Sequence, residues 1–154
     1  MNYQQKYKLP TFIQRHFGQD LQGKTFALWG LSFNPNTDDM REASSRVLME
    51  QLWAAGAKIK AYDPEAMNET QRIYGHREDL ELMGTKESAL QNADALIICT
   101  EWQNFRAPDF DVIKNALKEP VIFDGRNLFD PERLEKRGFT YYGIGRGASV
   151  NPVL

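Results

Sequence analysis

The sequence is poor in the residues that build metal centres and disulfide frameworks. Its 154 residues include 1 cysteine, Cys99, and 2 histidines, His16 and His76. One cysteine excludes an intramolecular disulfide and is consistent with a reducing compartment. Because Cys99 lies inside an apolar run, we expect it to be buried and inert. The histidines lie far apart and have no cysteine or carboxylate at ligand spacing, so the sequence predicts no metal site.

The sequence also lacks a strong net charge and a long apolar run. Its formal net charge is −2 at pH 7, which predicts neither a nucleic-acid partner nor a membrane-surface partner. The longest apolar run, Ala95 to Cys99, is far too short to cross a bilayer. The first residues lack the apolar core of a signal peptide, so we expect a cytoplasmic protein.

What is present is the pattern of one globular α/β domain. Hydrophobic residues make up 42% of the chain and charged residues 26%, which is ordinary for a soluble domain. Apolar runs predict strands at residues 25–29, 58–62, 80–83, 95–99, 121–123 and 139–142. Helical spacing predicts helices at residues 45–55, 70–74, 86–92, 110–117 and 131–136.

This alternation predicts a Rossmann-like three-layer domain, with a mostly parallel sheet and helices on both faces. In such folds ligands bind outside the carboxyl ends of the strands, where the strand order reverses. We expect the domain to cover residues 21–147 and a tail to cover residues 148–154. Residues 1–20 are expected to be a helix remnant and linker, in which Pro10 interrupts the helical spacing and Gly18 stops it.

A long polar loop, Gly30 to Glu42, follows the first predicted strand and leads into a helix near Ser44. It is too long for a simple strand-to-helix connection. Helix N-termini favour anions, and Arg41 would suit a phosphate there. The alternative is a surface loop in which Arg41 pairs with Asp38 or Asp39, and both interpretations stay open.

The same loop lacks the glycine fingerprint of dinucleotide-binding domains. Gly30 is followed by no second or third glycine at the required spacing. Asp63, at the end of the second predicted strand, therefore has no partner motif for binding a ribose. It is predicted instead to start the turn at Asp63-Pro64.

Two further polar loops follow predicted strands. Trp102 and Phe105 follow the fourth strand. Aromatic rings there can stack on a flat ligand, but the favoured interpretation is that both rings pack in the core or at an interface. Gly125 permits a tight turn before Arg126, whose planar fork of donors suits a phosphate or a nucleobase carbonyl. A surface pair between Asp124 and Arg126 is an equal alternative.

Three ordered segments, residues 30–43, 100–105 and 123–127, resemble the UDP-glucose 6-dehydrogenases of the UDP-glucose/GDP-mannose dehydrogenase family. The run Thr-Asp-Asp-Met-Arg-Glu at residues 37–42 is specific. The resemblance spans residues 2–147. It implies that the chain is the C-terminal UDP-binding domain of an enzyme that oxidises UDP-glucose to UDP-glucuronate with NAD.

The resemblance implies further that NAD would be bound mainly by an N-terminal domain. The catalytic cysteine would lie upstream as well, since Cys99 does not match it. The isolated chain would therefore be inactive, and the full-length enzyme would be a homo-oligomer.

The site residues follow from the same resemblance. Phe33, Asn34 and Arg126 fall at substrate-binding positions, and Arg41 falls where an arginine reaches NAD across the domain interface. No catalytic residue falls in this chain. The family commonly has lysine at Asn34 and proline at Ser44. Loss of that lysine implies weaker UDP-glucose binding or an altered specificity.

Two alternatives remain. The chain can be the domain of a related dehydrogenase that acts on another UDP- or GDP-sugar. It can also be a non-catalytic nucleotide-binding or interaction module on the same fold. Binding of UDP at the strand ends separates these possibilities.

Overall fold

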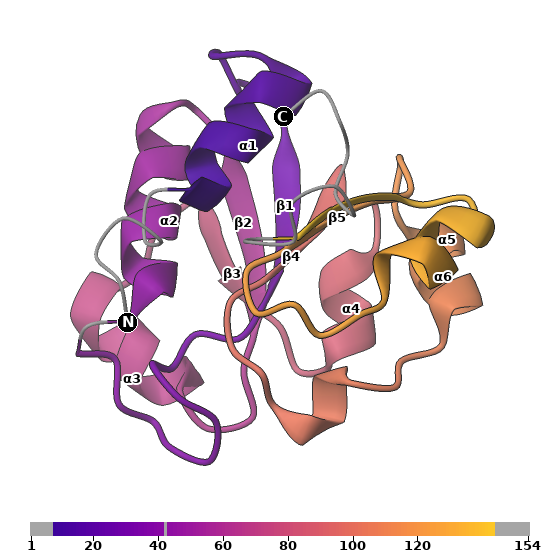
Figure 1. The fold of residues 1–154 in the computed structure, drawn as a ribbon. Coiled ribbons are helices and arrows are strands. Elements are labelled where there is room, and N and C mark those ends of the chain that lie inside the picture. The colour runs from indigo at the N-terminus through magenta and orange to yellow at the C-terminus, as the bar shows by residue number, and fades with distance from the viewer. Residues whose placement is uncertain (1–7, 42, 144–154) are drawn as a thin grey trace.

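A computed structural model describes residues 8–41 and 43–143 of the chain. At its centre is a six-stranded parallel sheet with the strand order β3-β2-β1-β4-β5-β6 (Figure 1). The strands are β1 (Thr25–Trp29), β2 (Lys58–Tyr62), β3 (Leu80–Leu82), β4 (Ala95–Ile98), β5 (Val121–Asp124) and β6 (Thr140–Gly143). Every predicted strand is present, with limits that differ by at most a residue or so.

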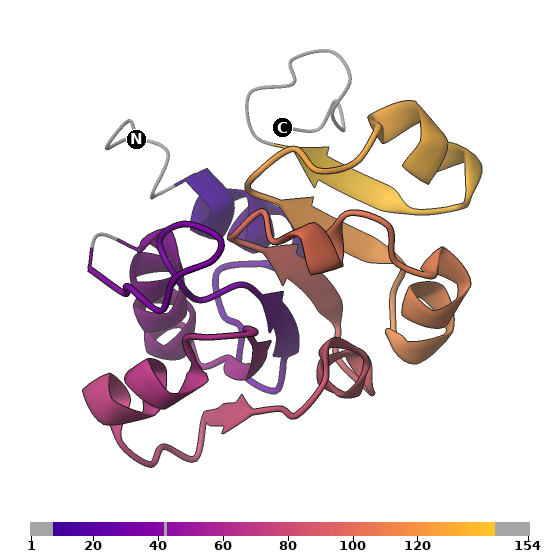
Figure 2. The ribbon, with the colours of Figure 1, turned by 90° about the horizontal axis from the view of Figure 1, so that it is seen from below.

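The helices are α1 (Lys8–Phe17), α2 (Ser44–Ala54), α3 (Met67–Tyr74), α4 (Lys86–Leu90), α5 (Phe110–Ala116) and α6 (Pro131–Lys136), with a short 3₁₀ turn η2 (Gln103–Phe105). Helices α1, α2 and α3 cover one face of the sheet, and α4, α5 and α6 cover the other (Figure 2). The predicted Rossmann-like three-layer fold is therefore confirmed.

Two apolar cores, one on each face of the sheet, hold these layers together. Along β1, Phe26 and Leu28 enter the core under α2, whereas Ala27 and Trp29 enter the core under α4 and α5. Successive strand residues point to opposite faces, so a strand buried on both sides needs a continuous apolar run. That requirement explains why the runs in the sequence locate the strands so well.

Helix α1 completes the first core. The right-handed crossovers of α2 and α3 cover the half of the sheet near β1, β2 and β3, which leaves the neighbouring half of that face bare. Leu9 and Ile13 of α1 fill this half and belong to the same buried cluster as Phe123 and Tyr142. In addition, His16 Nδ1 lies 2.7 Å from the hydroxyl oxygen of Tyr142.

The prediction that Pro10 interrupts the helical spacing is wrong, because Pro10 lies within α1. It is near the described start of the helix, where a backbone N–H has no acceptor inside the helix and proline is tolerated. Gly18 does end the helix: its φ is 101° and its N–H donates to the Gln14 carbonyl at 2.8 Å.

Parts of the predicted domain division lie outside the described residues. These are residues 1–7 of the expected remnant, residues 144–147 at the end of the expected domain, and the expected tail at 148–154. The division itself stays a prediction. Within residues 8–41 and 43–143, no helix combines the length and the apolar character needed to cross a membrane.

Candidate functional site

The candidate site lies where the strand order reverses, between the carboxyl ends of β1 and β4. In open parallel sheets the two loops at such a point diverge and leave a crevice for a ligand. The loops that follow β1, β4 and β5 meet here, and a chain of hydrogen bonds joins them. The site can therefore be built from the backbone upward, loop by loop.

Gly30 brings the loop after β1 against the loop after β4. Its φ is 99°, and a Cβ at this position would lie 2.6 Å from the Thr100 backbone nitrogen, so no other residue fits without displacement. The Thr100 hydroxyl then donates to the Ser32 carbonyl at 2.7 Å. Thr100 therefore packs directly against Gly30 and ties the loop after β4 to the loop after β1.

Asp63 anchors the same loop from the end of β2. Its carboxylate is fully buried. One oxygen accepts from the backbone N–H groups of Leu31 at 2.7 Å and Ser32 at 3.1 Å and from the Trp102 indole at 3.2 Å. The other accepts from the N–H groups of residues 65–66, both at 2.8 Å. The predicted turn is confirmed, and no acceptor is left for a ribose hydroxyl.

The aromatic residues after β4 pack inside the protein, as predicted. Trp102 is 7% exposed and Phe105 is fully buried. The Phe105 ring stacks on Trp29, with ring centroids 5.3 Å apart. Neither ring is therefore presented to a flat ligand, and both instead fix the loop that carries Thr100 and Glu101.

Asp124 anchors the loop after β5. Its fully buried carboxylate accepts from the Arg126 backbone N–H at 2.9 Å, from the N–H groups of residues 128–129 at 2.7 and 3.3 Å, and from the Tyr141 hydroxyl at 2.6 Å. Burial raises the pKa of Asp124, while these hydrogen bonds oppose that shift. The proposed surface pair between Asp124 and the Arg126 side chain is wrong, because Asp124 binds backbone groups.

The Arg126 guanidinium joins the three loops. Its Nε donates to the Cys99 carbonyl at 2.8 Å and its Nη2 donates to the Phe33 carbonyl at 3.1 Å. Its Nη1 lies 3.6 Å from a carboxylate oxygen of Glu101. The side chain is 19% exposed, so it holds the loops in place and still presents part of its fork of donors at the surface.

Gly125 permits this placement of Arg126. A Cβ at Gly125 would lie 2.8 Å from a Leu9 methyl carbon and 3.0 Å from the Ile98 carbonyl oxygen. The Gly125 N–H donates to that same oxygen at 2.9 Å. The absent side chain therefore lets β4, β5 and α1 approach one another below the arginine.

Of the predicted site residues, three come together. Phe33 is half-buried and contacts Arg126 through its carbonyl, and Asn34 follows it as an exposed residue whose carbonyl accepts from the Ser32 hydroxyl. Arg41 is not part of this group. It is 88% exposed and binds Asp39 through two side-chain hydrogen bonds, which confirms the surface pair. That bond holds the pKa of Asp39 below its usual value.

Two features of the site were missed by sequence reasoning. Glu101 was seen as part of a polar loop but was given no role, although it follows the strongest strand at the same edge as Arg126. Asp63 was predicted to start a turn, but its bonds to the β1 loop were not. Cys99 is buried as predicted, and burial raises its pKa to about 12.

The described residues hold no group of three His, Cys, Asp or Glu side chains that could bind a metal ion. The fold and the loops over its switch point define a Rossmann-like nucleotide-binding domain without the dinucleotide fingerprint. Residues 27–131 match the UDP binding domain of the UDP-glucose/GDP-mannose dehydrogenase family, and the chain belongs to this family.

Curated relatives agree with this assignment, and a solved structure agrees with the fold. The chain is 43% identical to a UDP-glucose 6-dehydrogenase of Pseudomonas aeruginosa, over 94% of this chain and 33% of the relative. It is 41% identical to a UDP-glucose 6-dehydrogenase of Rhizobium meliloti, over 84% of this chain and 29% of the relative. A UDP-glucose dehydrogenase structure from Pyrobaculum islandicum superposes with a TM-score of 0.75 at 23% identity, covering 97% of this chain and 31% of that chain. The chain thus spans about a third of the length of these relatives.

Proposed function

We propose that this domain binds the nucleotide of UDP-glucose in an NAD-dependent UDP-glucose 6-dehydrogenase, which converts UDP-glucose to UDP-glucuronate. The family match and the names of the relatives support the reaction. The observation that carries the site is the Arg126 guanidinium, which lies over the β1/β4 switch point and contacts the Phe33 carbonyl.

In this proposal Arg126 has two tasks. Two of its five N–H donors bind the Cys99 and Phe33 carbonyls and fix the loops. The remaining donors bind a phosphate or a uracil carbonyl of the ligand, in competition with Glu101. Phe33 supplies a flat apolar surface beside them, and Asn34 supplies a polar contact.

The residues of this chain do not fit NAD at the usual dinucleotide position. Thr100 occupies the space beside Gly30, and the Asp63 carboxylate has no acceptor left for a ribose. NAD would therefore be held mainly by another domain of a longer protein. Arg41 is exposed enough to reach a cofactor bound there, at the small cost of breaking its surface pair with Asp39.

The test is a calorimetric titration of UDP into the wild-type chain and an Arg126→Ala variant. A charge-assisted hydrogen bond contributes about 1.5–3 kcal/mol, so the variant should bind UDP roughly 10- to 100-fold more weakly. Arg126→Lys should recover most of the affinity if only charge matters and little if the contact is bidentate.

Arg72→Ala is the matched control, because Arg72 is exposed and pairs with Glu69 on α3. It should bind UDP like wild type. Thermal melts of all variants show whether the loops remain folded. If folded Arg126→Ala bound UDP as tightly as wild type, Arg126 would not be part of the nucleotide site.

A related dehydrogenase acting on another UDP- or GDP-sugar is the second candidate. It is favoured by Asn34, which stands where the family commonly has lysine. A non-catalytic binding module remains the third. Parallel titrations with UDP and GDP separate a UDP-sugar enzyme from a GDP-sugar enzyme, and a chain that binds neither nucleotide supports a non-catalytic interaction module.

A further inference from the structure

A pocket lies on the face of the sheet covered by α5 and α6, apart from the candidate nucleotide site. Its volume is about 340 Å³, and it opens between residues 106–111 and residues 128–137. Phe33, Asn34, Glu101 and Arg126 do not line it. The family assignment gives it no role, and its size is at the lower end of that of small-molecule sites.

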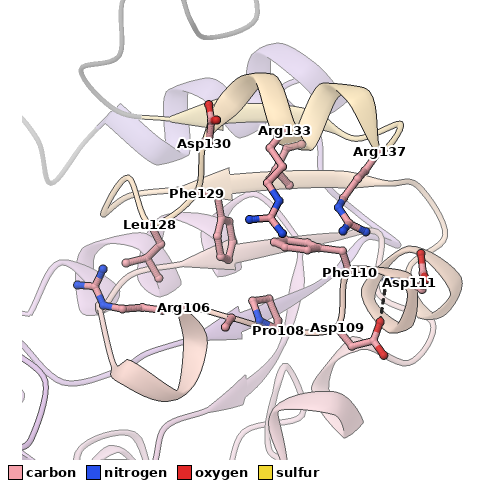
Figure 3. A pocket seen from close by; sticks show the side chains of 12 residues that line it. Arg106, Pro108, Asp109, Phe110, Asp111, Leu128, Phe129, Asp130, Arg133 and Arg137 are labelled. Atoms are coloured by element: carbon pink, nitrogen blue, oxygen red, sulfur yellow. Dashed lines mark hydrogen bonds between the residues drawn. The ribbon is translucent and has the colours of Figure 1, made fainter.

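Arginines without carboxylate partners line this pocket. Arg133 lies on α6 and Arg137, four residues further on, caps the C-terminus of this helix; both side chains project toward Phe110 (Figure 3). Arg106 lies at the opposite rim. Within the described part of the chain, none of the three guanidiniums makes an ion pair. Other arginines differ, since a carboxylate lies within ion-pair distance of Arg41, Arg72, Arg77 and Arg126.

Three aspartates line this pocket, and two of them cap helices. Asp109 caps α5 by accepting from the backbone N–H groups of residues 111–112. Asp130 caps α6 in the same way, and its carboxylate points away from Phe110 (Figure 3). The third, Asp111, is exposed, and within the described residues no carboxylate lies within ion-pair distance of Arg133 or Arg137.

The floor of the pocket is aromatic. Phe110 is 8% exposed, and its ring meets Phe129 edge-on at 5.2 Å between centroids. The Arg137 guanidinium lies over the Phe110 ring at 5.2 Å, a contact that holds the cation near the pocket. Lys114 donates to the Arg137 carbonyl at 2.9 Å and ties the end of α6 to α5.

We propose that this pocket binds a small organic phosphate, whose phosphate lies between Arg133 and Arg137 and whose body rests on Phe110 and Phe129. Two like charges one helical turn apart repel each other, and a shared dianion removes that repulsion. Guanidinium forks match phosphate oxygens in a bidentate manner. The apolar floor distinguishes an organic phosphate from the free ion.

The experiment is an amide NMR titration of the chain with phenyl phosphate and, separately, with inorganic phosphate, both without UDP, because UDP is itself an organic phosphate and would compete for the pocket. Phenyl phosphate should shift the amides of residues 106–111 and 128–137. The double variant Arg133→Gln/Arg137→Gln should weaken this binding at least about tenfold. Its matched control is Arg72→Gln/Lys118→Gln, which removes the same charge from exposed positions elsewhere and should bind like wild type.

Inorganic phosphate should bind at the same amides but more weakly. The proposal is overturned if phenyl phosphate leaves these amides unshifted, or if the Arg133/Arg137 double variant binds as well as wild type. Equal affinity for the two phosphates would also overturn it, because the aromatic floor would then contribute nothing. None of these outcomes depends on whether UDP binds at Arg126.

Discussion

The two sides of the switch point each rest on a fully buried aspartate, and the two aspartates are used differently. Asp63 binds its own turn, the loop after β1 and the Trp102 indole from the loop after β4. Asp124 binds the loop that follows it and the Tyr141 hydroxyl from the adjoining strand. One carboxylate thus fixes the position of Phe33 and the other that of Arg126. Asp63 connects loops that are distant in the sequence, so removing its carboxylate should destabilise a larger part of the structure.

The largest effect is expected for Asp63→Ala. Removing the carboxylate leaves several buried donors without an acceptor, and we expect a loss of about 3–5 kcal/mol in the free energy of unfolding. Urea denaturation followed by tryptophan fluorescence measures it. Asp20→Ala is the matched control, because Asp20 also accepts from a backbone N–H but is exposed. A loss no larger than that of Asp20→Ala would show that Asp63 does not anchor the loops.

A smaller loss is expected on the other side for Tyr141→Phe. This change removes one donor from Asp124 and should cost about 1–2 kcal/mol. The control is Tyr62→Phe, whose hydroxyl makes no side-chain hydrogen bond within the described residues and should cost almost nothing. If Tyr141→Phe cost as much as Asp63→Ala, the contrast between the two anchors would fail.

The same variant has a pH signature. Burial raises the pKa of Asp124, so the folded state holds this proton more tightly than the unfolded state. Stability therefore falls as the pH rises from the unfolded value of about 4 through the raised folded value. The Tyr141 hydroxyl opposes that shift, so Tyr141→Phe should extend the fall to higher pH. Unfolding curves at several pH values test this, and an unchanged pH dependence would contradict it.

UDP affinity also tests how the two anchored sides of the site differ. Glu101 faces Arg126 from the loop after β4, and Trp102 fixes that loop. Glu101→Gln frees the Nη1 donors and removes a negative charge near the incoming phosphate, so UDP should bind about 5-fold more tightly. Titration calorimetry at low salt measures the change. Glu87→Gln, at an exposed site on α4, should leave the affinity unaltered. Weaker binding of UDP by Glu101→Gln would mean that Glu101 helps to hold the ligand.

The smallest effect is expected for Asn34→Lys. A lysine there adds a cation beside the proposed phosphate position, and because Asn34 is exposed we expect UDP binding to tighten only about 2- to 3-fold. Asn115→Lys on α5 serves as the control for added charge. Unaltered affinity would show that Asn34 does not lie near the nucleotide, and Arg126 would then be the main contact.

The sequence predicts the sheet well because its strands are buried on both faces. Residues 25–29 and 58–62 match β1 and β2 residue for residue, since such strands need apolar runs whose ends are visible. The ends of the helices are predicted less well: α3 begins at Met67 and not at Thr70 as predicted. The turn that leads into α3 is held by the Asp63 hydrogen bonds to residues 65–66, which apolar periodicity does not record.

The contacts of the site could not be predicted from local pattern. Arg126 contacts Phe33, which is 93 positions away in the sequence. This contact depends on the strand order and on Gly30 and Gly125, which let neighbouring segments approach closely. The resemblance placed both residues near the nucleotide but did not reveal that Arg126 binds protein carbonyls. Likewise, Arg133 and Arg137 look like ordinary surface charges of a helix until Phe110 is placed beneath them.

Helix α1 shows that the segment a family has in common and the segment that folds as one unit need not have the same limits. The family match begins at residue 27, yet Leu9 and Ile13 lie in the core and Leu9 lies directly under Gly125. A protein cut at the limits of the match would expose the apolar surface of β5 and β6 and lose the support beneath the loop that carries Arg126. Anyone who grafts this domain onto another scaffold therefore needs to carry the helix along with it.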